Sequence, residues 1–238
     1  MSFTSSLIWR MLPKQKRRLL VNLMHPLDGR QVDLLMRGSA QLPQYFLSKK
    51  SIFVHVPKTA GTSIWESCFN EKGAGHTPYS WYQRIAPKQC REYFTFSFVR
   101  NPWDRLVSAY HYLLERGPLE RDSGWSDLVR SFNGFDDFVH NWMCLENIEK
   151  HIHFVPQYRF LINRYGVIDL DYVGRFESIA LDLDEIKCRI KGGGNEVSTT
   201  KVRNSSKRDE YRGYYTDETR KKVGKLYARD IELFGYSF

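Results

Sequence analysis

The sequence predicts a single α/β domain in which a central parallel sheet is flanked by helices. Two apolar runs, residues 52–56 and 93–99, each lead through a short loop into a helical pattern. A third run, residues 167–176, has the composition of another strand. Strands that alternate with helices are typical of a sheet covered on both faces. The 238 residues suffice for one substantial hydrophobic core.

The first run belongs to the stretch SIFVHVPKTAGTSIWESCF, which has the pattern strand, small-residue loop, helix. This arrangement directs backbone N–H groups and the positive end of a helix dipole at an anion. Gly61 allows close approach of the backbone, and Lys58 adds a cation. We therefore predict a phosphate or sulfate site. Its loop residues are Pro57, Lys58, Thr59, Ala60, Gly61, Thr62 and Ser63. The simpler alternative is a helix cap, with Thr62 or Ser63 as the N-cap.

The second run continues as FVRNPWDRLVSAY. Asn101 is predicted to cap the following helix, which leaves Arg100 at the end of a strand and beside a helix N-terminus. Ser108 shares a helix face with Asp104 by their i,i+4 spacing. Arg100 and Ser108 together suit a second anionic group. The alternative is that Arg100 pairs with a carboxylate and Ser108 is a small packing residue.

Together the two stretches resemble the sulfotransferase superfamily. PKTAGTS resembles the loop that binds the 5′-phosphosulfate of 3′-phosphoadenosine 5′-phosphosulfate (PAPS), and RNPWDRLVSAY resembles the segment that binds its 3′-phosphate. The likeness extends over residues 51–238, through VGRFESIALDLDEI to the terminal FGYSF. The motifs are similar to those of the carbohydrate branch. That branch includes the Golgi enzymes acting on chondroitin, dermatan and heparan chains and their bacterial relatives.

The resemblance implies the nucleotide-kinase-like P-loop fold of sulfotransferases. It also implies transfer of a sulfuryl group from PAPS to a carbohydrate hydroxyl, with PAP as product and no metal. Lys58 would neutralise the leaving oxygen, the loop would hold the 5′-phosphate, and Arg100 and Ser108 the 3′-phosphate. The late loop that closes over the cofactor in the family matches residues Arg203, Asn204, Ser205, Ser206 and Lys207. Its alternative is a solvated basic loop.

A histidine suits the role of general base near neutral pH, and the chain has seven. Relatives with a histidine base place it between the two cofactor motifs, which matches His76. His153 is the second candidate, because alternation with His151 places both rings on one side of an extended segment. His55 is expected to be structural. Glu66 is a further possibility, since carboxylates are the base in other branches.

Charge and composition limit the remaining choices. The net charge of +9 predicts an anionic partner, and we expect an acceptor carbohydrate rather than nucleic acid. The four cysteines lack metal-ligand spacing and are expected to be free thiols. Phe132, Phe135, Phe138, Val139 and Trp142 have core-like spacing, and Trp125 and Trp142 are the candidates for sugar stacking.

Residues 1–50 are expected to form a basic helical extension, followed by a sulfotransferase domain over residues 51–238. No apolar run there is long enough to span a bilayer, and Golgi members of the family carry a membrane anchor. This predicts a soluble, cytoplasmic, bacterial enzyme. The alternative for the extension is a basic amphipathic helix lying on a membrane.

Two other classes of function stay open. An ATP-using, kinase-like enzyme with an atypical loop would require Mg²⁺, although the order GxxxxGK[ST] is absent. A non-catalytic protein that binds heparin-like or nucleic-acid polyanions would bind with a steep dependence on salt.

Overall fold

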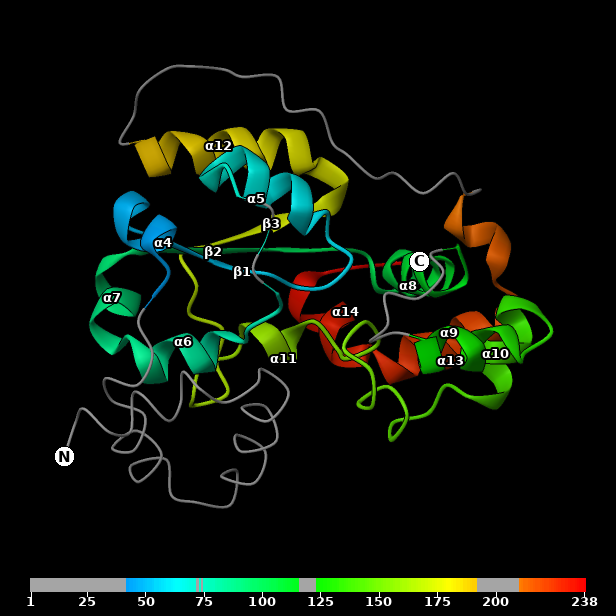
Figure 1. Ribbon diagram of the computed structural model, residues 1–238. Helices are drawn as coiled ribbons and strands as arrows, with labels where there is room; N and C mark the ends of the chain where they lie inside the picture. Colours follow the sequence, from blue (N-terminus) through cyan, green and yellow to red (C-terminus); the bar gives the residue numbers. More distant parts are fainter. Residues whose placement is uncertain (1–41, 72, 74, 116–122, 192–209) are drawn as a thin grey trace.

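The computed structural model describes residues 42–71, 73, 75–115, 123–191 and 210–238 (Figure 1). Its centre is a three-stranded parallel sheet in the order β1-β2-β3. The strands are β1 (Ser51–Val54), β2 (Phe94–Val99) and β3 (Tyr172–Arg175). Ser51 is the partner of Phe94, and Phe96 is the partner of Tyr172. The predicted α/β architecture with a central parallel sheet is therefore confirmed.

The strands are shorter than the apolar runs that predicted them. β1 stops at Val54, and β3 begins only at Tyr172 although the run starts at residue 167. The Asp171 carboxylate accepts the backbone N–H of Thr95 at 2.7 Å and its hydroxyl at 2.8 Å. Because this side chain uses the Thr95 N–H, pairing of β3 with β2 begins one residue later.

Helices cover both faces of the sheet, as Figure 1 shows. On one face lie α5 (Gly61–Phe69) and α12 (Ile179–Lys191). On the other lie α6 (Tyr79–Ile85), α7 (Pro87–Glu92), α11 (Tyr158–Leu161) and α14 (Ala228–Phe234). With both faces covered, β1 is buried along its whole length, which explains its uninterrupted apolar sequence.

The amino end of the described chain packs into this same core. Helix α4 (Gln44–Lys49) leads directly into β1, and the fully buried ring of Phe46 stacks on Trp65 with centroids 5.5 Å apart. This helix falls within the predicted N-terminal extension, most of which lies outside the described residues. Among the residues that the structure describes, no helix has the length and apolar character needed to cross a membrane.

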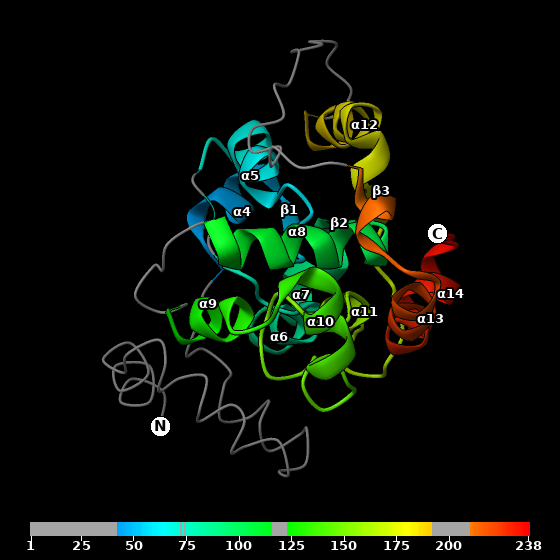
Figure 2. The same cartoon turned by 90° about the vertical axis from the view of Figure 1, so that its right-hand side faces the viewer.

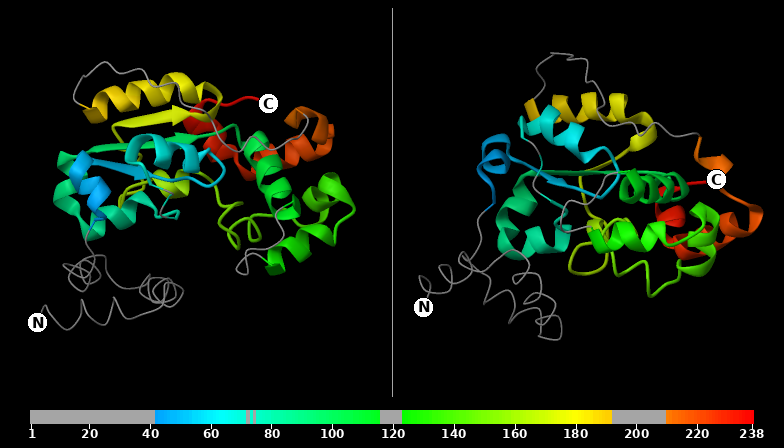
Figure 3. Two further views of the ribbon diagram at one scale, coloured as in Figure 1. Left: turned by 45° about the horizontal axis from the view of Figure 1, so that its top comes forward. Right: turned by 45° about the vertical axis from the view of Figure 1, so that its right-hand side comes forward.

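A second hydrophobic core lies beyond the carboxyl ends of the strands (Figures 2 and 3). It joins α8 (Pro102–Glu115), α9 (Ser123–Arg130), α10 (Gly134–Asn141) and α13 (Asp217–Leu226). The aromatic residues predicted to be core meet here, with Phe138 fully buried and stacked on Trp142 at 5.1 Å. Trp142 is thus a core residue, which removes it as a candidate for sugar stacking.

Local capping signals in the sequence are confirmed. The Trp103 N–H donates to Asn101 Oδ1 at 3.1 Å at the start of α8, and Thr216 forms a capping box with Thr219 at the start of α13. The sequence of residues 217–234 predicts one continuous amphipathic helix, but the structure divides it into α13 and α14 at Tyr227. The buried Tyr227 hydroxyl donates to the Phe154 carbonyl at 2.7 Å, so a distant contact fixes the break.

A buried pair of polar residues, Gln157 and Asp230, supports the end of β2, and we call this pair the strut. The Arg100 N–H donates to Gln157 Oε1 at 2.9 Å, and Gln157 Nε2 donates to the Arg100 carbonyl at 2.8 Å. Asp230 on α14 accepts the N–H groups of Gln157 and Tyr158 at 2.7 and 2.9 Å. Gln157 and Asp230 have no exposed surface, and burial raises the pKa of the Asp230 carboxyl. The strut therefore fixes the backbone at Arg100 through side chains remote in sequence.

Replacing Gln157 by Leu is expected to destabilise the fold. The variant leaves the Arg100 N–H and carbonyl without the amide that satisfies them, so the free energy of unfolding should fall by roughly 2–4 kcal/mol. Urea unfolding measures this loss. Gln83→Leu is the matched control, because Gln83 accepts the Arg164 N–H at an exposed position. Equal losses in the two variants would contradict the role given to the strut.

Candidate functional site

The predicted anion loop connects β1 to α5 at the carboxyl end of the sheet. The N-cap of α5 is Ala60, and no side chain caps the helix. The alternative that Thr62 or Ser63 is the N-cap is therefore wrong, since both lie in the first helical turn. A helix start leaves its first N–H groups without intrahelical partners, so an uncapped turn suits an anionic ligand.

The loop backbone adopts an uncommon conformation. Lys58 and Ala60 have φ angles of 71° and 60°, in the left-handed region that non-glycine residues rarely occupy. Such conformations cost on the order of 1–3 kcal/mol each and gather at ligand-binding sites. Thr59 helps to hold the loop, because its hydroxyl donates to the Val56 carbonyl at 2.9 Å. Two left-handed residues within three positions distinguish this loop from an ordinary connection between a strand and a helix.

The side chain of His55 restricts position 61 to glycine. A Cβ atom built on Gly61 would lie 1.7 Å from His55 Nε2, so the imidazole occupies the space that any side chain would need. The sequence predicted close approach of a ligand to this glycine. The structure adds a second reason, the packing of the His55 ring against the first residue of α5.

Lys58 and Arg100 come together at the ends of β1 and β2. Arg100 Nη1 donates to the Lys58 carbonyl at 3.0 Å, which joins the anion loop to the second motif. The Lys58 ammonium lies over the Tyr112 ring, 4.1 Å from its centroid. The sequence analysis did not predict Tyr112 as a site residue. The signal was its position on α8, four residues after Ser108 and therefore on the same helix face.

Arg100 is 7% exposed, and its side chain is held on several sides. Its Nε donates to Asp104 Oδ2 at 2.7 Å, and the guanidinium lies 3.8 Å from the centroid of the Phe176 ring. Pairing of Arg100 with a carboxylate, one of the two alternatives drawn from the sequence, is thus present. Ser108 is buried on α8. These contacts fix the plane and direction of the guanidinium.

Histidine and aromatic rings form a connected group beside Lys58, which we call the histidine cluster: His55, His76, His151, His153 and Tyr112. Ring centroids are 4.2 Å apart for His55 and His76, 6.1 Å for His76 and His153, and 4.9 Å for His153 and Tyr112. His151 and His153 lie 4.9 Å apart. They are close as predicted, but on a turn rather than an extended segment.

The members of the cluster differ in how easily they accept a proton. Burial, then the neighbouring His151 and Lys58, hold the pKa of His153 well below its usual value. Burial, then His76, also lowers the pKa of His55. His76 is half-buried, and its Nδ1 lies 3.2 Å from the His55 carbonyl. Because a carbonyl only accepts, this contact places a proton on His76 Nδ1.

Comparison with known proteins agrees with this geometry. The profile of the sulfotransferase family matches residues 45–237. The chain belongs to the sulfotransferase family. An uncharacterized protein of Archaeoglobus fulgidus is 30% identical over 109 residues, which are 45% of this chain and 75% of that protein. No solved structure matched the chain. Membership indicates an enzyme of sulfuryl transfer, and the family in general uses PAPS and a hydroxyl acceptor.

The remaining predictions for this sulfotransferase concern a second candidate base, the late loop, the cysteines and metal binding. Glu66 is exposed on α5. The late-loop residues Arg203, Asn204, Ser205, Ser206 and Lys207 fall outside the described residues. Cys68, Cys90, Cys144 and Cys188 are all free thiols, as expected. In the part of the chain that the structure describes, no three His, Cys, Asp or Glu side chains are grouped to hold a metal ion.

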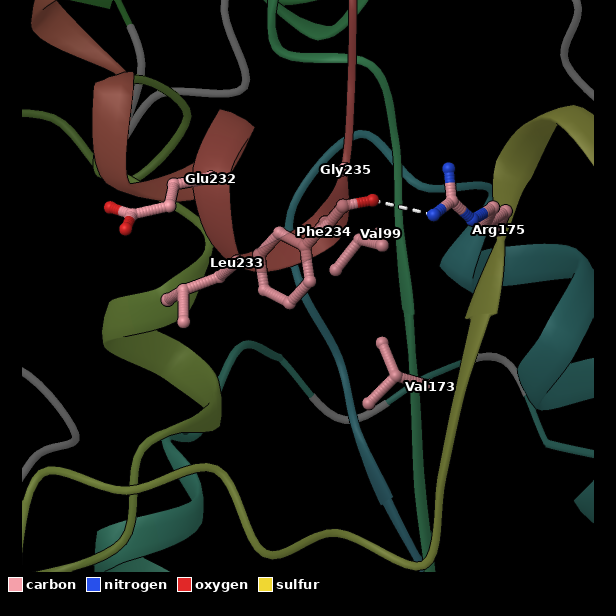
Figure 4. Close-up of a pocket in the computed structure, with 7 residues that line it drawn as sticks. All are labelled: Val99, Val173, Arg175, Glu232, Leu233, Phe234 and Gly235. Carbon is pink, nitrogen blue, oxygen red and sulfur yellow. Dashed lines mark hydrogen bonds between the residues drawn. The ribbon is translucent and has the colours of Figure 1, made fainter.

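A separate pocket of about 450 Å³ lies between the ends of β2 and β3 and the last helix (Figure 4). Arg175 Nη2 crosses it and donates to the Phe234 carbonyl at 2.5 Å. Its described lining residues are Val99, Val173, Arg175, Glu232, Leu233, Phe234 and Gly235. None of the site residues predicted from the sequence is among them, so the pocket is distinct from the anion loop.

Gly61→Ala is expected to disturb the fold through His55. The added methyl group overlaps the imidazole and should lower the free energy of unfolding by about 1–3 kcal/mol. In a His55→Ala background the ring is gone, so the same substitution should cost about 0.5 kcal/mol or less. Chemical unfolding of the four proteins in this cycle measures the coupling. Equal costs in both backgrounds would contradict the contact.

Proposed function

We propose that this sulfotransferase uses PAPS and transfers its sulfuryl group to a carbohydrate hydroxyl. The observation that carries the proposal is the bond between Arg100 and the Lys58 carbonyl. It brings the loop that resembles a 5′-phosphosulfate site and the residue that resembles a 3′-phosphate ligand to the same edge of the sheet. Two anion sites on neighbouring parallel strands fit a donor with phosphates at both positions.

The loop fits the 5′-phosphosulfate. The uncapped start of α5 offers the N–H groups of Gly61 and Thr62, and Lys58 and Ala60 give the loop before it a left-handed backbone. PAPS supplies a sulfuryl group whose S–O bond breaks as negative charge develops on the leaving phosphate, by analogy with phosphoryl transfer. We assign Lys58 to neutralise that charge. The full set of proposed loop ligands is Pro57, Lys58, Thr59, Ala60, Gly61, Thr62 and Ser63.

Arg100 and Ser108 are the proposed ligands of the 3′-phosphate. Asp104 and the Lys58 carbonyl set the orientation of the guanidinium, and Ser108 lies one turn beyond Asp104 on α8. A fixed guanidinium binds phosphate with less loss of side-chain freedom than a mobile one. The five basic and polar residues 203–207 are proposed as additional cofactor ligands, as the family resemblance implies.

We assign His76 as the general base that takes the proton of the acceptor hydroxyl. Its Nδ1 lies 3.2 Å from the His55 carbonyl, and its ring lies between those of His55 and His153. His153 is the less suitable candidate, because burial and nearby positive groups oppose its protonated form. A neutral His153 instead lines the site between Tyr112 and His76.

The carbohydrate acceptor is supported by the motif likeness to the carbohydrate branch and by the net charge of +9, which favours acidic chains. One aromatic side chain beside the histidine cluster is a candidate for contact with a sugar ring. Trp125 is half-buried, and its ring lies 4.6 Å from His151 at the end of the histidine cluster. It remains the candidate platform for a sugar ring.

Nucleotide binding tests the donor. Without metal, calorimetric titration should show tighter binding of PAP than of adenosine 5′-phosphate or ATP, because only PAP places a phosphate at Arg100. Arg100→Ala should weaken PAP by about tenfold or more and leave adenosine 5′-phosphate nearly unchanged. Ser108→Ala is the milder companion variant, and thermal unfolding confirms that both are folded.

Other outcomes of this titration would favour the alternatives. Equal or tighter binding of ATP, with a requirement for Mg²⁺, would point to the kinase-like enzyme. Binding of none of the three nucleotides, combined with salt-sensitive binding of heparin, would point to a polyanion-binding protein.

Turnover tests the catalytic roles. With PAPS and desulfated chondroitin or heparan chains, Lys58→Ala should lower kcat by roughly 10²–10³-fold through loss of charge stabilisation. His76→Ala should lower kcat by about 10²–10⁴-fold, with little change in PAP affinity. Lys88→Ala is the control, since Lys88 is exposed on α7. Near-normal turnover of His76→Ala would reject the base assignment and favour His153.

A further inference from the structure

Lys58 is contacted at both of its ends by the second motif. At the backbone, Arg100 Nη1 donates to the Lys58 carbonyl at 3.0 Å. At the side chain, the ammonium lies 4.1 Å from the centroid of the Tyr112 ring, a distance at which the ring face attracts a cation. Arg100 follows the last residue of β2, and Tyr112 lies about three turns along α8. One strand-to-helix unit therefore holds the lysine at two points.

The Tyr112 ring has a defined place in the fold. Arg105, also on α8, is 1% exposed and donates to the carbonyls of His153 and Val155 at 3.2 and 2.7 Å. These bonds fix α8 against the segment that carries His153. The Tyr112 ring then meets the His153 ring edge to face, with centroids 4.9 Å apart. The surface that faces the Lys58 ammonium is thus set by buried contacts of its own helix.

The Lys58 ammonium is directed toward the histidine cluster. After burial and a neighbouring histidine, Lys58 is among the groups that lower the pKa of both His55 and His153. The ammonium is therefore close to the side chains beside which the acceptor hydroxyl is proposed to react. A lysine side chain has a flexible four-carbon stem, and fixing it costs conformational entropy. A contact that fixes it before the reaction removes this cost from the reaction step.

We propose that Tyr112 is a positioning residue for Lys58. Its ring face holds the ammonium against α8, while Arg100 holds the carbonyl of the same lysine. The side chain thus meets the leaving oxygen of the donor in an orientation that is already set. This inference rests on the proposed role of Lys58 in neutralising that oxygen.

Two variants separate the ring face from the hydroxyl group. Tyr112→Phe keeps the aromatic face, and Tyr112→Leu removes it. NMR with isotope-labelled lysine, in which Lys58→Arg assigns the signal, reports the contact because a ring face shields the protons beside the ammonium. With PAP bound, we expect upfield Lys58 signals in the wild type and in Tyr112→Phe, and loss of this shift in Tyr112→Leu. The matched control is Tyr214→Leu, a half-buried ring that contacts His111 on α8.

Turnover is the second readout. Tyr112→Leu should lower kcat by roughly 3- to 30-fold, the range expected for a cation–π contact, and change the Kd of PAP by less than about threefold. Tyr112→Phe should retain at least about half of the turnover. In a Lys58→Ala background, Tyr112→Leu should cause no further loss. A further loss of similar size there would mean that the ring acts through His153, and it would overturn the inference.

The outcomes separate this inference from the proposed role of Lys58. Normal turnover of Lys58→Ala would reject that role, and the inference with it. If Lys58→Ala loses turnover but Tyr112→Leu and Tyr112→Phe turn over equally well, Lys58 keeps its role and Tyr112 is not a positioning residue. Should Tyr112→Leu not fold, the wild type still decides. Unshielded Lys58 signals in its PAP complex would overturn the inference, because the ring would then hold the lysine only before the donor binds.

Discussion

The structure of the site depends on the fixed position of Arg100. Its guanidinium joins the loop after β1 to the start of α8 through Lys58 and Asp104, and its backbone is held on both sides by Gln157. Asp230 on the last helix holds Gln157 in turn. Because buried polar groups are costly when unpaired, every member of this network restricts the others. The two proposed phosphate sites are thus held in a fixed relation to each other.

The positive surroundings of the site act differently on its two parts, the anion loop and the histidine cluster. At the anion loop, an uncapped helix start and Lys58 favour negative charge. In the histidine cluster, burial and the nearby cations disfavour the protonated form, as the lowered pKa values of His55 and His153 show. The same positive surroundings that suit a sulfate donor therefore keep the buried imidazoles of His55 and His153 neutral at neutral pH.

Much of this arrangement is encoded locally and was predicted from the sequence. The apolar runs give the strands, Asn101 and Thr216 cap their helices, and the two motifs put Lys58 in the loop after one strand and Arg100 at the end of another. These features depend on residues within a few positions of one another, which is why pattern and capping rules find them. His76 was proposed from its place between the motifs, and the structure puts it beside His55 and near His153.

Only the tertiary structure decided which residues far apart in the chain come into contact. Gln157 meets Arg100 across 57 positions, and Tyr227 breaks the final helix by bonding to Phe154 across 73. His55, expected to be structural, lies past the end of β1 against Gly61 and His76. The sequence by itself determined the elements, the motifs and their chemical class. Only the tertiary structure determined which side chain packs against Gly61 and which side chain pairs with the buried backbone of Arg100, because these contacts form only after the elements pack.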